Sequence, residues 1–183
     1  MSNTYTGKLA LITGGSSGIG LELAKMLYAS GADLALLARD EAKLASAKAI
    51  LEEQNNPDRG RVALFSCDVS DYEAVNAATE QVQAKLGLPD FVFNCAGVAR
   101  PGYVEELPIE VFKWTMDIDY HGTVNVIKAC LPAFIKRGSG HFITISSLAG
   151  LIGTFGYTAY SAAKFALRGF SDTLRAEMKP KGI

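Results

Sequence analysis

The feature that most constrains the fold of this chain is a glycine-rich stretch, residues 13–20, between a short apolar run and an amphipathic segment. The apolar run, residues 9–12, predicts a buried strand, and the spacing of apolar residues in 21–28 predicts a helix. Where a strand turns through glycines into a helix, exposed backbone N–H groups and the positive end of the helix dipole bind phosphate. The spacing G-x-x-x-G-x-G is not that of a P-loop, and no G-K-[ST] follows it. Taken alone, the stretch is also compatible with a flexible glycine-rich loop.

The three glycines of this motif have separate predicted roles. Gly14 allows a tight turn with a positive φ, a conformation that glycine adopts at little cost. Gly18 lets backbone N–H groups approach a pyrophosphate without an intervening Cβ, and Gly20 lets the helix pack closely on the strand. We therefore predict a dinucleotide-binding turn whose contacts come from Gly14, Ser16, Ser17, Gly18, Ile19 and Gly20.

Length and composition exclude several classes of protein. The 183 residues suit one domain, and a net charge of −1 favours neither nucleic acid nor an anionic membrane surface as a partner. No apolar run approaches the length of a membrane span. Cys67, Cys95 and Cys130 lie in apolar runs without C-x-x-C spacing, which argues against a disulfide scaffold or a zinc site. They fit a reducing compartment, so we expect a cytoplasmic protein without a metal site.

Apolar strands alternate with amphipathic helices along the whole chain. The predicted strands are 8–13, 33–38, 62–67, 90–93 and 141–146. The predicted helices are 18–30, 41–53, 71–86, 108–136 and 157–178. Ser70 is the predicted N-cap of the third helix and Asp40 that of the second, while residues 55–57 end the second helix.

This alternation predicts the α/β class, with a doubly wound parallel (Rossmann) sheet in a three-layer α/β/α arrangement and strand order 3-2-1-4-5. Ligands of such sheets bind at the carboxyl ends of the strands, near the switch between strands 1 and 4. Every predicted strand end carries glycine or polar residues: the glycine turn, Arg39, Asp68, residues 94–97 and residues 146–147. Strand ends are often rich in loop residues, but the full set favours an extended cofactor site.

Tyr160, Lys164 and Ser147 form the candidate catalytic group. Tyr160 and Lys164 are four positions apart and share one face of the last helix, and Ser147 precedes Tyr160 by 13 residues. A phenol has an ordinary pKa of about 10, and a nearby ammonium stabilises its phenolate. Tyr160 could then protonate a carbonyl oxygen as hydride reaches the carbon, with Ser147 holding that oxygen. An exposed Tyr–Lys pair on a solvated helix is the alternative.

In this order and spacing, the motifs resemble the short-chain dehydrogenase/reductase family. The resemblance covers essentially the whole chain and rests on the glycine turn, residues 94–97 (Asn-Cys-Ala-Gly), Ser147 and Tyr160-x-x-x-Lys164. It implies that Tyr160 is the acid/base, that Lys164 lowers its pKa and binds the nicotinamide ribose, and that Ser147 orients the carbonyl. It further implies cofactor contacts from Asp68, Val69, Asn94, Ala96, Gly97, Tyr160 and Lys164.

Two features depart from the family pattern. Asp119 stands where the family has a catalytic asparagine, 28 residues before the serine, that helps to hold a water in a proton relay. An ionised aspartate accepts hydrogen bonds but cannot donate them, so Asp119 is a candidate catalytic residue of altered role, and its neighbour His121 is either a relay group or an ordinary helix residue. The chain also ends at Ile183, where family members continue. We expect residues 1–183 to form a single dinucleotide-binding reductase domain that lacks its C-terminal portion.

The end of the second predicted strand indicates which cofactor is used. NAD-preferring relatives have an acidic residue there for the ribose 2′-hydroxyl, whereas this chain has Ala38 followed by Arg39. Arginine pairs with a 2′-phosphate and stacks on adenine, so the predicted cofactor is NADP(H).

The resemblance implies an oxidoreductase that reduces a ketone to a secondary alcohol. Within the family the closest resemblance is to 3-ketodihydrosphingosine reductases, which implies a long-chain, lipid-like ketone as substrate. Another reductase activity, such as 3-oxoacyl thioester reduction, and a non-catalytic NADP(H)-binding redox sensor are the alternatives. Apolar residues between Ser147 and Tyr160 would either line an alkyl channel or pack against a C-terminal lid: Leu148, Leu151, Ile152, Phe155 and Tyr157.

The family also implies a homodimer or homotetramer in which the two long helices of one subunit pair with their copies in another. Four apolar residues of these helices are candidates for the core or for such an interface: Trp114, Val126, Phe134 and Phe170.

Overall fold

The computed structural model describes residues 5–53 and 60–183. Its centre is a parallel five-stranded sheet with the order β3-β2-β1-β4-β5, as the sequence predicts. The strands are β1 Leu9–Thr13, β2 Asp33–Ala38, β3 Val62–Ser66, β4 Phe91–Asn94 and β5 His141–Thr144. The helices are α1 Gly18–Ala29, α2 Glu41–Glu52, α3 Tyr72–Leu86, α4 Ile109–Met116, α5 Gly122–Arg137 and α6 Thr158–Met178. Three short helical segments are η1 Asp117–His121, η2 Leu148–Gly150 and η3 Lys179–Lys181.

The pairing of β1 with both β2 and β4 creates the switch at which doubly wound sheets bind ligands. Thr13, the last residue of β1, is paired with Leu37 on one side and with Asn94 on the other. Asn94 is in turn paired with Thr144 at the end of β5. The carboxyl ends of β1, β2, β4 and β5 therefore lie along one edge of the sheet, and the loops that follow them share that edge.

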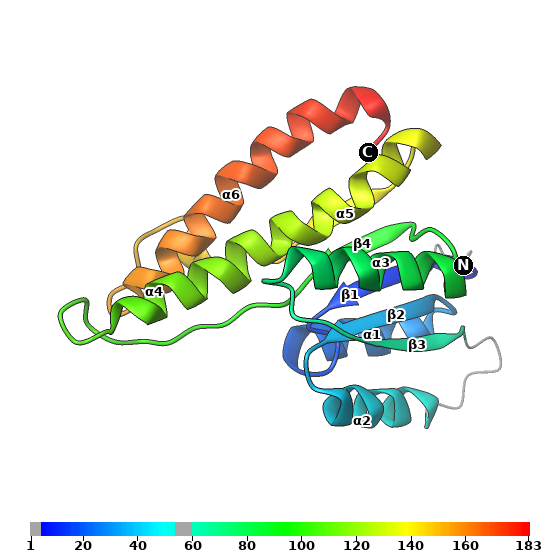
Figure 1. Ribbon diagram of the computed structural model, residues 1–183, viewed down its shortest axis with the longest axis horizontal. Coiled ribbons are helices and arrows are strands. Elements are labelled where there is room, and N and C mark those ends of the chain that lie inside the picture. The colour runs from blue at the N-terminus through cyan, green and yellow to red at the C-terminus, as the bar shows by residue number, and fades with distance from the viewer. Residues whose placement is uncertain (1–4, 54–59) are drawn as a thin grey trace.

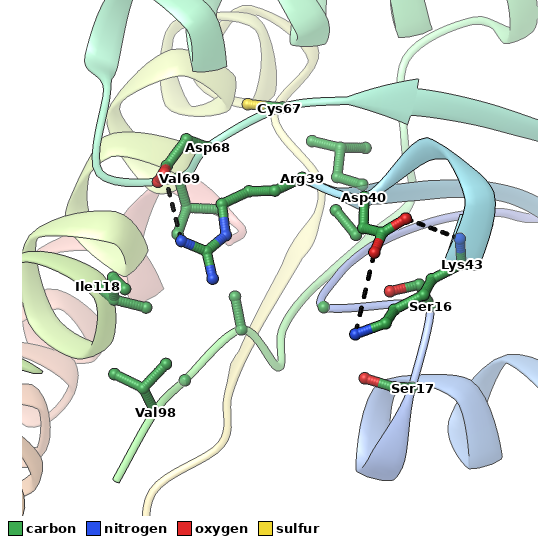
Figure 2. A pocket seen from close by; sticks show the side chains of 15 residues that line it. Ser16, Ser17, Arg39, Asp40, Lys43, Cys67, Asp68, Val69, Val98 and Ile118 are labelled. Atoms are coloured by element: carbon green, nitrogen blue, oxygen red, sulfur yellow. Dashed lines mark hydrogen bonds and ion pairs between the residues drawn. The ribbon is translucent and has the colours of Figure 1, made fainter. Parts of the chain in front are cut away.

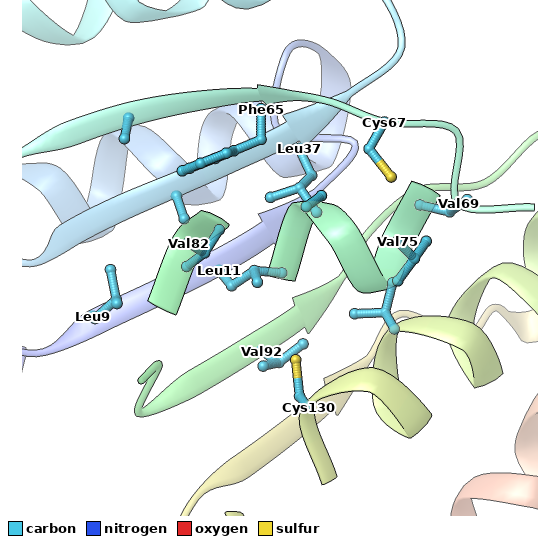
Figure 3. Close-up of a cluster of buried hydrophobic side chains, with 14 of the residues drawn as sticks. Leu9, Leu11, Leu37, Phe65, Cys67, Val69, Val75, Val82, Val92 and Cys130 are labelled. Atoms are coloured by element: carbon cyan, nitrogen blue, oxygen red, sulfur yellow. The ribbon is translucent and has the colours of Figure 1, made fainter. Parts of the chain in front are cut away.

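Helices cover both faces of the sheet and give the predicted three layers (Figure 1). On one face, residues of the sheet pack against α3 and α5, with Val75, Val82 and Cys130 in the shared core (Figure 3). On the other face the sheet packs against α1 and α2 through residues such as Leu27 and Leu44. β1 is buried along its whole length, because helices cover it above and below, which explains its continuous apolar sequence.

The helix caps agree with the sequence with one exception. Asp40 accepts a hydrogen bond from the Lys43 N–H at 3.0 Å and caps α2, as predicted. The prediction of Ser70 as the cap of α3 is wrong, because the Asp71 carboxylate accepts the Ala74 N–H at 3.1 Å. The Ser70 hydroxyl donates to Asp68 instead, at 2.7 Å. The predicted end of α2 at residues 55–57 lies outside the described residues.

The long helix predicted over 108–136 is divided by a π-helical segment. Residues Asp117–His121 form the π-helix η1 between α4 and α5, and Pro108 is the N-cap of α4. A π turn is wider than an α turn and changes which side chains face the interior. Here Ile118 and Asp119 are buried, while Asp117 and His121 are exposed and contact each other at 3.1 Å. His121 is therefore a surface helix residue and does not contact Lys164.

The burial of four apolar helix residues separates core residues from candidates for a subunit interface. Val126 and Phe134 are buried within the core of one subunit, so they are not interface residues. Trp114 and Phe170 remain partly exposed. Within residues 5–53 and 60–183, no helix is both long enough and apolar enough to cross a membrane.

Candidate active site

The glycine turn between β1 and α1 has the geometry that the sequence predicts. Gly14 and Gly18 have φ values of +65° and +53°, which side chains rarely adopt. A Cβ on Gly20 would lie 2.4 Å from the Gly14 carbonyl oxygen, so α1 packs against the turn only because residue 20 is glycine. Ser17, the N-cap of α1, makes no side-chain capping hydrogen bond. The first N–H groups of α1 therefore keep their capacity to bind an anion.

Thr13 joins this turn to the turn that follows β4. Its hydroxyl oxygen accepts the N–H groups of Cys95 and Ala96, each at 3.1 Å, and its hydrogen points to the Phe93 carbonyl at 3.5 Å. A Cβ on Gly14 would lie 3.0 Å from the backbone of Ala96, so the two turns are in direct contact. Thr13 is a site residue that sequence reasoning missed, although a threonine at the end of the strand before the glycines was a usable signal.

A pocket lies along this edge of the sheet (Figure 2). One wall is the glycine turn with Ser16 and Ser17, and the other is Val98 and Ile118. The end of β2 and the loop after β3 line the part of the pocket between these two walls. Most of the predicted cofactor residues line it: Gly14, Ser16, Ser17, Arg39, Asp68, Val69, Ala96 and Gly97. Gly18, Ile19, Gly20 and Asn94 are not lining residues, but they belong to the two turns that form the pocket's wall. Tyr160 and Lys164, the remaining predicted cofactor residues, do not line the pocket either.

Arg39 and Lys43 bring positive charge to the end of the pocket near β2. The Arg39 guanidinium is 3.7 Å from the Asp68 carboxylate and remains 60% exposed. Partial burial raises the pKa of Asp68, but hydrogen bonds from Ser70 and the charge of Arg39 outweigh it and hold the pKa below its ordinary value. The Lys43 ammonium, which the sequence analysis did not name, lies 3.9 Å from Asp40 and lines the same pocket. It lies on the first turn of α2, on the side of the pocket with Ser16 and Ser17, whereas the Arg39 guanidinium lies on the side with Asp68 (Figure 2).

Behind Gly97, which lines the pocket, lies the buried pair of Lys164 and Asp119. The Lys164 ammonium lies 3.4 Å from one Asp119 carboxylate oxygen, and it donates to the Ile145 carbonyl at 3.1 Å. The other Asp119 oxygen accepts the Val98 N–H at 2.7 Å. Burial raises the pKa of Asp119, and the Lys164 ammonium and the Val98 N–H oppose this rise. A Cβ on Gly97 would lie 3.3 Å from Asp119 and 3.5 Å from Lys164, so the backbone of Gly97 packs directly against this pair.

Tyr160 lies on α6, the helix that carries Lys164, and Ser147 lies at the start of η2. Tyr160 is one turn before Lys164 on α6, and the Lys164 ammonium is 5.5 Å from the centroid of the Tyr160 ring. Ser147 caps η2, which packs against α6, and its hydroxyl oxygen accepts the Ala149 N–H at 3.1 Å. The hydroxyl hydrogen of Ser147 is not used in this bond and can be donated to a substrate oxygen. Lys164 is thus buried in an ion pair with Asp119 and Tyr160 is half-buried, so the two do not form an exposed pair on a solvated helix.

Two apolar loops lie next to Tyr160. The loop before α4 and the loop before α6 are joined by a parallel bridge, in which the Gly102 N–H donates to the Gly156 carbonyl at 2.9 Å. The rings of Tyr103 and Phe155 then meet edge to face at 5.5 Å, although Phe155 is 85% exposed. Leu148, Leu151 and Ile152 are also exposed. Four of the five apolar residues predicted between Ser147 and Tyr160 therefore form an uncovered surface near the catalytic group, and the fifth, Tyr157, is half-buried.

These features fit a nicotinamide dinucleotide. Glycine turns leave room for a pyrophosphate at an uncapped helix N-terminus, and cations lie at one end of the pocket. Asn94, at the end of β4, is buried, and its amide has no hydrogen-bond partner among the described residues. No group of His, Cys, Asp or Glu side chains within residues 5–53 and 60–183 is arranged to hold a metal ion.

Comparison with known proteins identifies the family. The model of the short chain dehydrogenase family matches residues 8–183. The chain belongs to this family. It is 44% identical to the 3-dehydrosphinganine reductase of Danio rerio over 178 residues, which cover 97% of this chain and 54% of that protein. The chain thus spans about half the length of this relative.

Solved structures of short-chain dehydrogenases confirm the fold. L-Sorbose reductase from Gluconobacter frateurii, complexed with NADPH and L-sorbose, has a TM-score of 0.92 at 31% identity, covering 100% of this chain and 68% of that one. An NAD⁺-bound xylitol dehydrogenase has a TM-score of 0.93 at 29% identity, covering 98% and 68%. The family therefore uses nicotinamide cofactors of both kinds on a fold that this chain shares.

Proposed function

We propose that this protein is an NADP(H)-dependent reductase of a long-chain ketone, with 3-ketodihydrosphingosine as the substrate. The observation that carries the proposal is the Lys164 ammonium, which lies beside the Tyr160 ring and packs behind Gly97, a residue that lines the pocket. The similarity to the 3-dehydrosphinganine reductase of Danio rerio and, at 42% identity, to the 3-ketodihydrosphingosine reductase of Bos taurus supports this substrate. The exposed apolar surface of the two loops is the part of the site that would contact an alkyl chain.

The proposed chemistry is the addition of a hydride and a proton across the carbonyl group. The reduced nicotinamide supplies the hydride when it is bound. The Ser147 hydroxyl donates a hydrogen bond to the ketone oxygen and holds it, while the Tyr160 hydroxyl transfers its proton to that oxygen. Lys164 stabilises the resulting phenolate by its charge, since an opposite charge nearby favours the ionised form. In the reverse direction Tyr160 accepts the proton of the alcohol.

A chain-length series tests the substrate. We expect the full-length protein to reduce 3-ketodihydrosphingosine with NADPH, and kcat/KM to fall about fourfold for each methylene removed from the alkyl chain. This figure follows from about 0.8 kcal/mol for each buried CH₂ group. Cofactor oxidation, followed by absorbance, gives the rates. A flat response, or a preference for short ketones or 3-oxoacyl thioesters, would reject the sphingolipid substrate and leave the reductase activity. No turnover with any ketone would favour a redox sensor.

The cofactor preference is tested by Arg39→Ala. Arg39 and Lys43 can pair with the 2′-phosphate of NADP(H), whereas Ala38 offers nothing to a ribose 2′-hydroxyl. We expect the substitution to weaken NADPH binding about 10- to 100-fold, because hydrogen bonds to charged groups contribute roughly 1.5–3 kcal/mol, and to change NADH binding little. Fluorescence titration measures both dissociation constants. Lys48→Ala, also on α2 but paired with Glu52 away from the pocket, is the control. Equal weakening of NADPH and NADH binding by Arg39→Ala would contradict the prediction.

We also expect the protein to form a dimer or a tetramer. Ile109, Trp114 and Phe165 expose 60%, 38% and 45% of their surface on α4 and α6, which pack together. Burial of these side chains in a second subunit would remove apolar surface from water. Light scattering at micromolar concentration is expected to give twice or four times the monomer mass, and Trp114→Glu is expected to lower it. A monomer for the unsubstituted protein would contradict this expectation.

A further inference from the structure

The buried ion pair between Asp119 and Lys164 has a consequence for the chemistry of Tyr160. Asp119 is fully buried and Lys164 is 5% exposed, so water screens their interaction weakly. One Asp119 oxygen accepts the Val98 N–H, and the other lies 3.4 Å from the Lys164 ammonium but accepts no hydrogen bond from the described residues. Burial raises the pKa of Asp119, while the Lys164 ammonium and the Val98 N–H favour its ionised form, which accepts hydrogen bonds and donates none.

The other charged and titratable groups near Lys164 are few. From the end of β4 comes the Cys95 thiol, whose pKa burial raises to about 11, so that it is neutral at physiological pH. From the end of β5 comes the neutral Ile145 carbonyl, and from α6 the Tyr160 phenol. On η1 itself, Asp117 and His121 are exposed and contact each other. Across the described part of the chain, Asp119 is the carboxylate that forms an ion pair with Lys164.

We propose that Asp119 is a positioning residue that fixes Lys164 and compensates part of its charge, so that Tyr160 exchanges its proton at a higher pH than it would beside an asparagine. The proposal rests on the proposed role of Tyr160 as the acid/base. The positive charge of Lys164 stabilises the Tyr160 phenolate, whereas the negative charge of Asp119 destabilises it. The pKa of Tyr160 depends on the sum of these two effects. Asp119 thereby takes a role that the family's neutral asparagine cannot have.

Asp119→Asn removes the negative charge with little change in shape. The Asn oxygen can still accept the Val98 N–H, and Lys164 keeps the Ile145 carbonyl as an acceptor. Tyr160 then experiences a larger share of the ammonium charge. We expect the pKa seen in the pH profile of kcat/KM for alcohol oxidation to fall by about one unit, the size of a charge effect over roughly 10 Å at an effective dielectric of about 20.

Asp117→Asn is the matched control. It removes the same charge from the same π-helical segment, but Asp117 is 55% exposed and contacts His121. We expect its pH profile to coincide with that of the unsubstituted protein. A profile of Asp119→Asn that is unchanged, or shifted to higher pH, would overturn the proposal. An equal downward shift in Asp117→Asn would do the same, because it would show a general charge effect.

A double-mutant cycle tests the ion pair without any turnover. Asp119→Asn, Lys164→Ala and the double variant are compared by urea unfolding in the absence of cofactor and substrate. We expect the double variant to lose less stability than the two single variants together, because each single change leaves one buried group without its partner. Additive losses would overturn the proposal. If Asp119→Asn does not fold, the double variant is expected to fold, and its failure to do so would count equally against the ion pair.

The two tests separate failure of this proposal from failure of the proposed function. If Tyr160 is not the acid/base, Tyr160→Phe keeps a near-normal rate, whereas failure of this proposal alone leaves Tyr160→Phe defective while the pH profile of Asp119→Asn is unchanged. If Asp119 does not pair with Lys164, the cycle shows no coupling although the protein reduces ketones. Cofactor titration of Asp119→Asn completes the comparison, and we expect its dissociation constant to stay within about threefold of the unsubstituted value.

Discussion

Tyr160→Phe is expected to lower the rate of ketone reduction by roughly 10²–10⁴-fold, the range that a positioned general acid contributes. The substitution removes one hydroxyl and keeps the ring beside the Lys164 ammonium. Cofactor binding should therefore persist, since the residues that line the pocket are unchanged. Single-turnover rates with saturating NADPH, together with the dissociation constant for NADPH, measure both effects.

Tyr157→Phe is the control for this substitution. Tyr157 is the N-cap of α6, and its ring centroid lies 6.2 Å from that of Tyr160. The two variants therefore lose the same hydroxyl group from neighbouring positions. We expect Tyr157→Phe to retain most of the activity. A near-normal rate for Tyr160→Phe would remove Tyr160 from the mechanism, and an equal loss in both variants would point to disturbed packing of the loop.

Lys164→Ala is expected to reduce both stability and activity. The substitution removes the cation that pairs with the buried carboxylate of Asp119 and the donor to the Ile145 carbonyl. Loss of one partner from a buried ion pair costs roughly 3–5 kcal/mol of unfolding free energy. The rate should fall as well, because the phenolate of Tyr160 loses the charge that stabilises it. Urea unfolding and steady-state kinetics give the two quantities separately.

Lys128→Ala provides the comparison for a lysine of the same charge. Lys128 is exposed on α5, and we expect its removal to change the free energy of unfolding by less than about 0.5 kcal/mol.

The loss of stability in Lys164→Ala is expected to depend on pH. An unpaired buried Asp119 becomes protonated, so its folded-state pKa rises further above the unfolded value. The variant should then lose stability as the pH rises through the unfolded pKa toward that raised value. A defect independent of pH would show that Asp119 is not the group left unpaired.

The sequence predicted the sheet because each strand carried a strong and local signal. The central strand is a short continuous apolar run bounded by turn residues, and the fixed handedness of parallel crossovers left few ways to order five such strands. The glycine turn was predictable for a similar reason, since positive φ at Gly14 and close packing at Gly20 are backbone requirements that no other residue meets.

The parts that could not be predicted depend on contacts between distant segments or on small differences between neighbours. The π-helical segment at Asp117–His121 is invisible to helical periodicity, because the apolar spacing on each side of it is that of an ordinary helix. Lys43 reaches the pocket only because α2 begins directly beside the end of β2. Ser70 and Asp71 are adjacent, and both residue types cap helices. Asp71 caps α3, whereas the Ser70 hydroxyl donates to Asp68.

The strand order also determines when the protein can fold as it is made by the ribosome. β1 is synthesised first, and β2 can pair with it once the first crossover is complete. The other edge of β1 has no partner until β4 emerges, since Ala10 pairs with Phe91. During the synthesis of the intervening segment, β1 presents an open edge to other nascent chains. The anchoring of β1 by Asp90, which accepts the Leu9 N–H at 3.0 Å, also waits for this moment. Slowing translation just before Phe91 would prolong the open-edge state and should lower the yield of soluble protein, whereas slowing it after Thr144 should not.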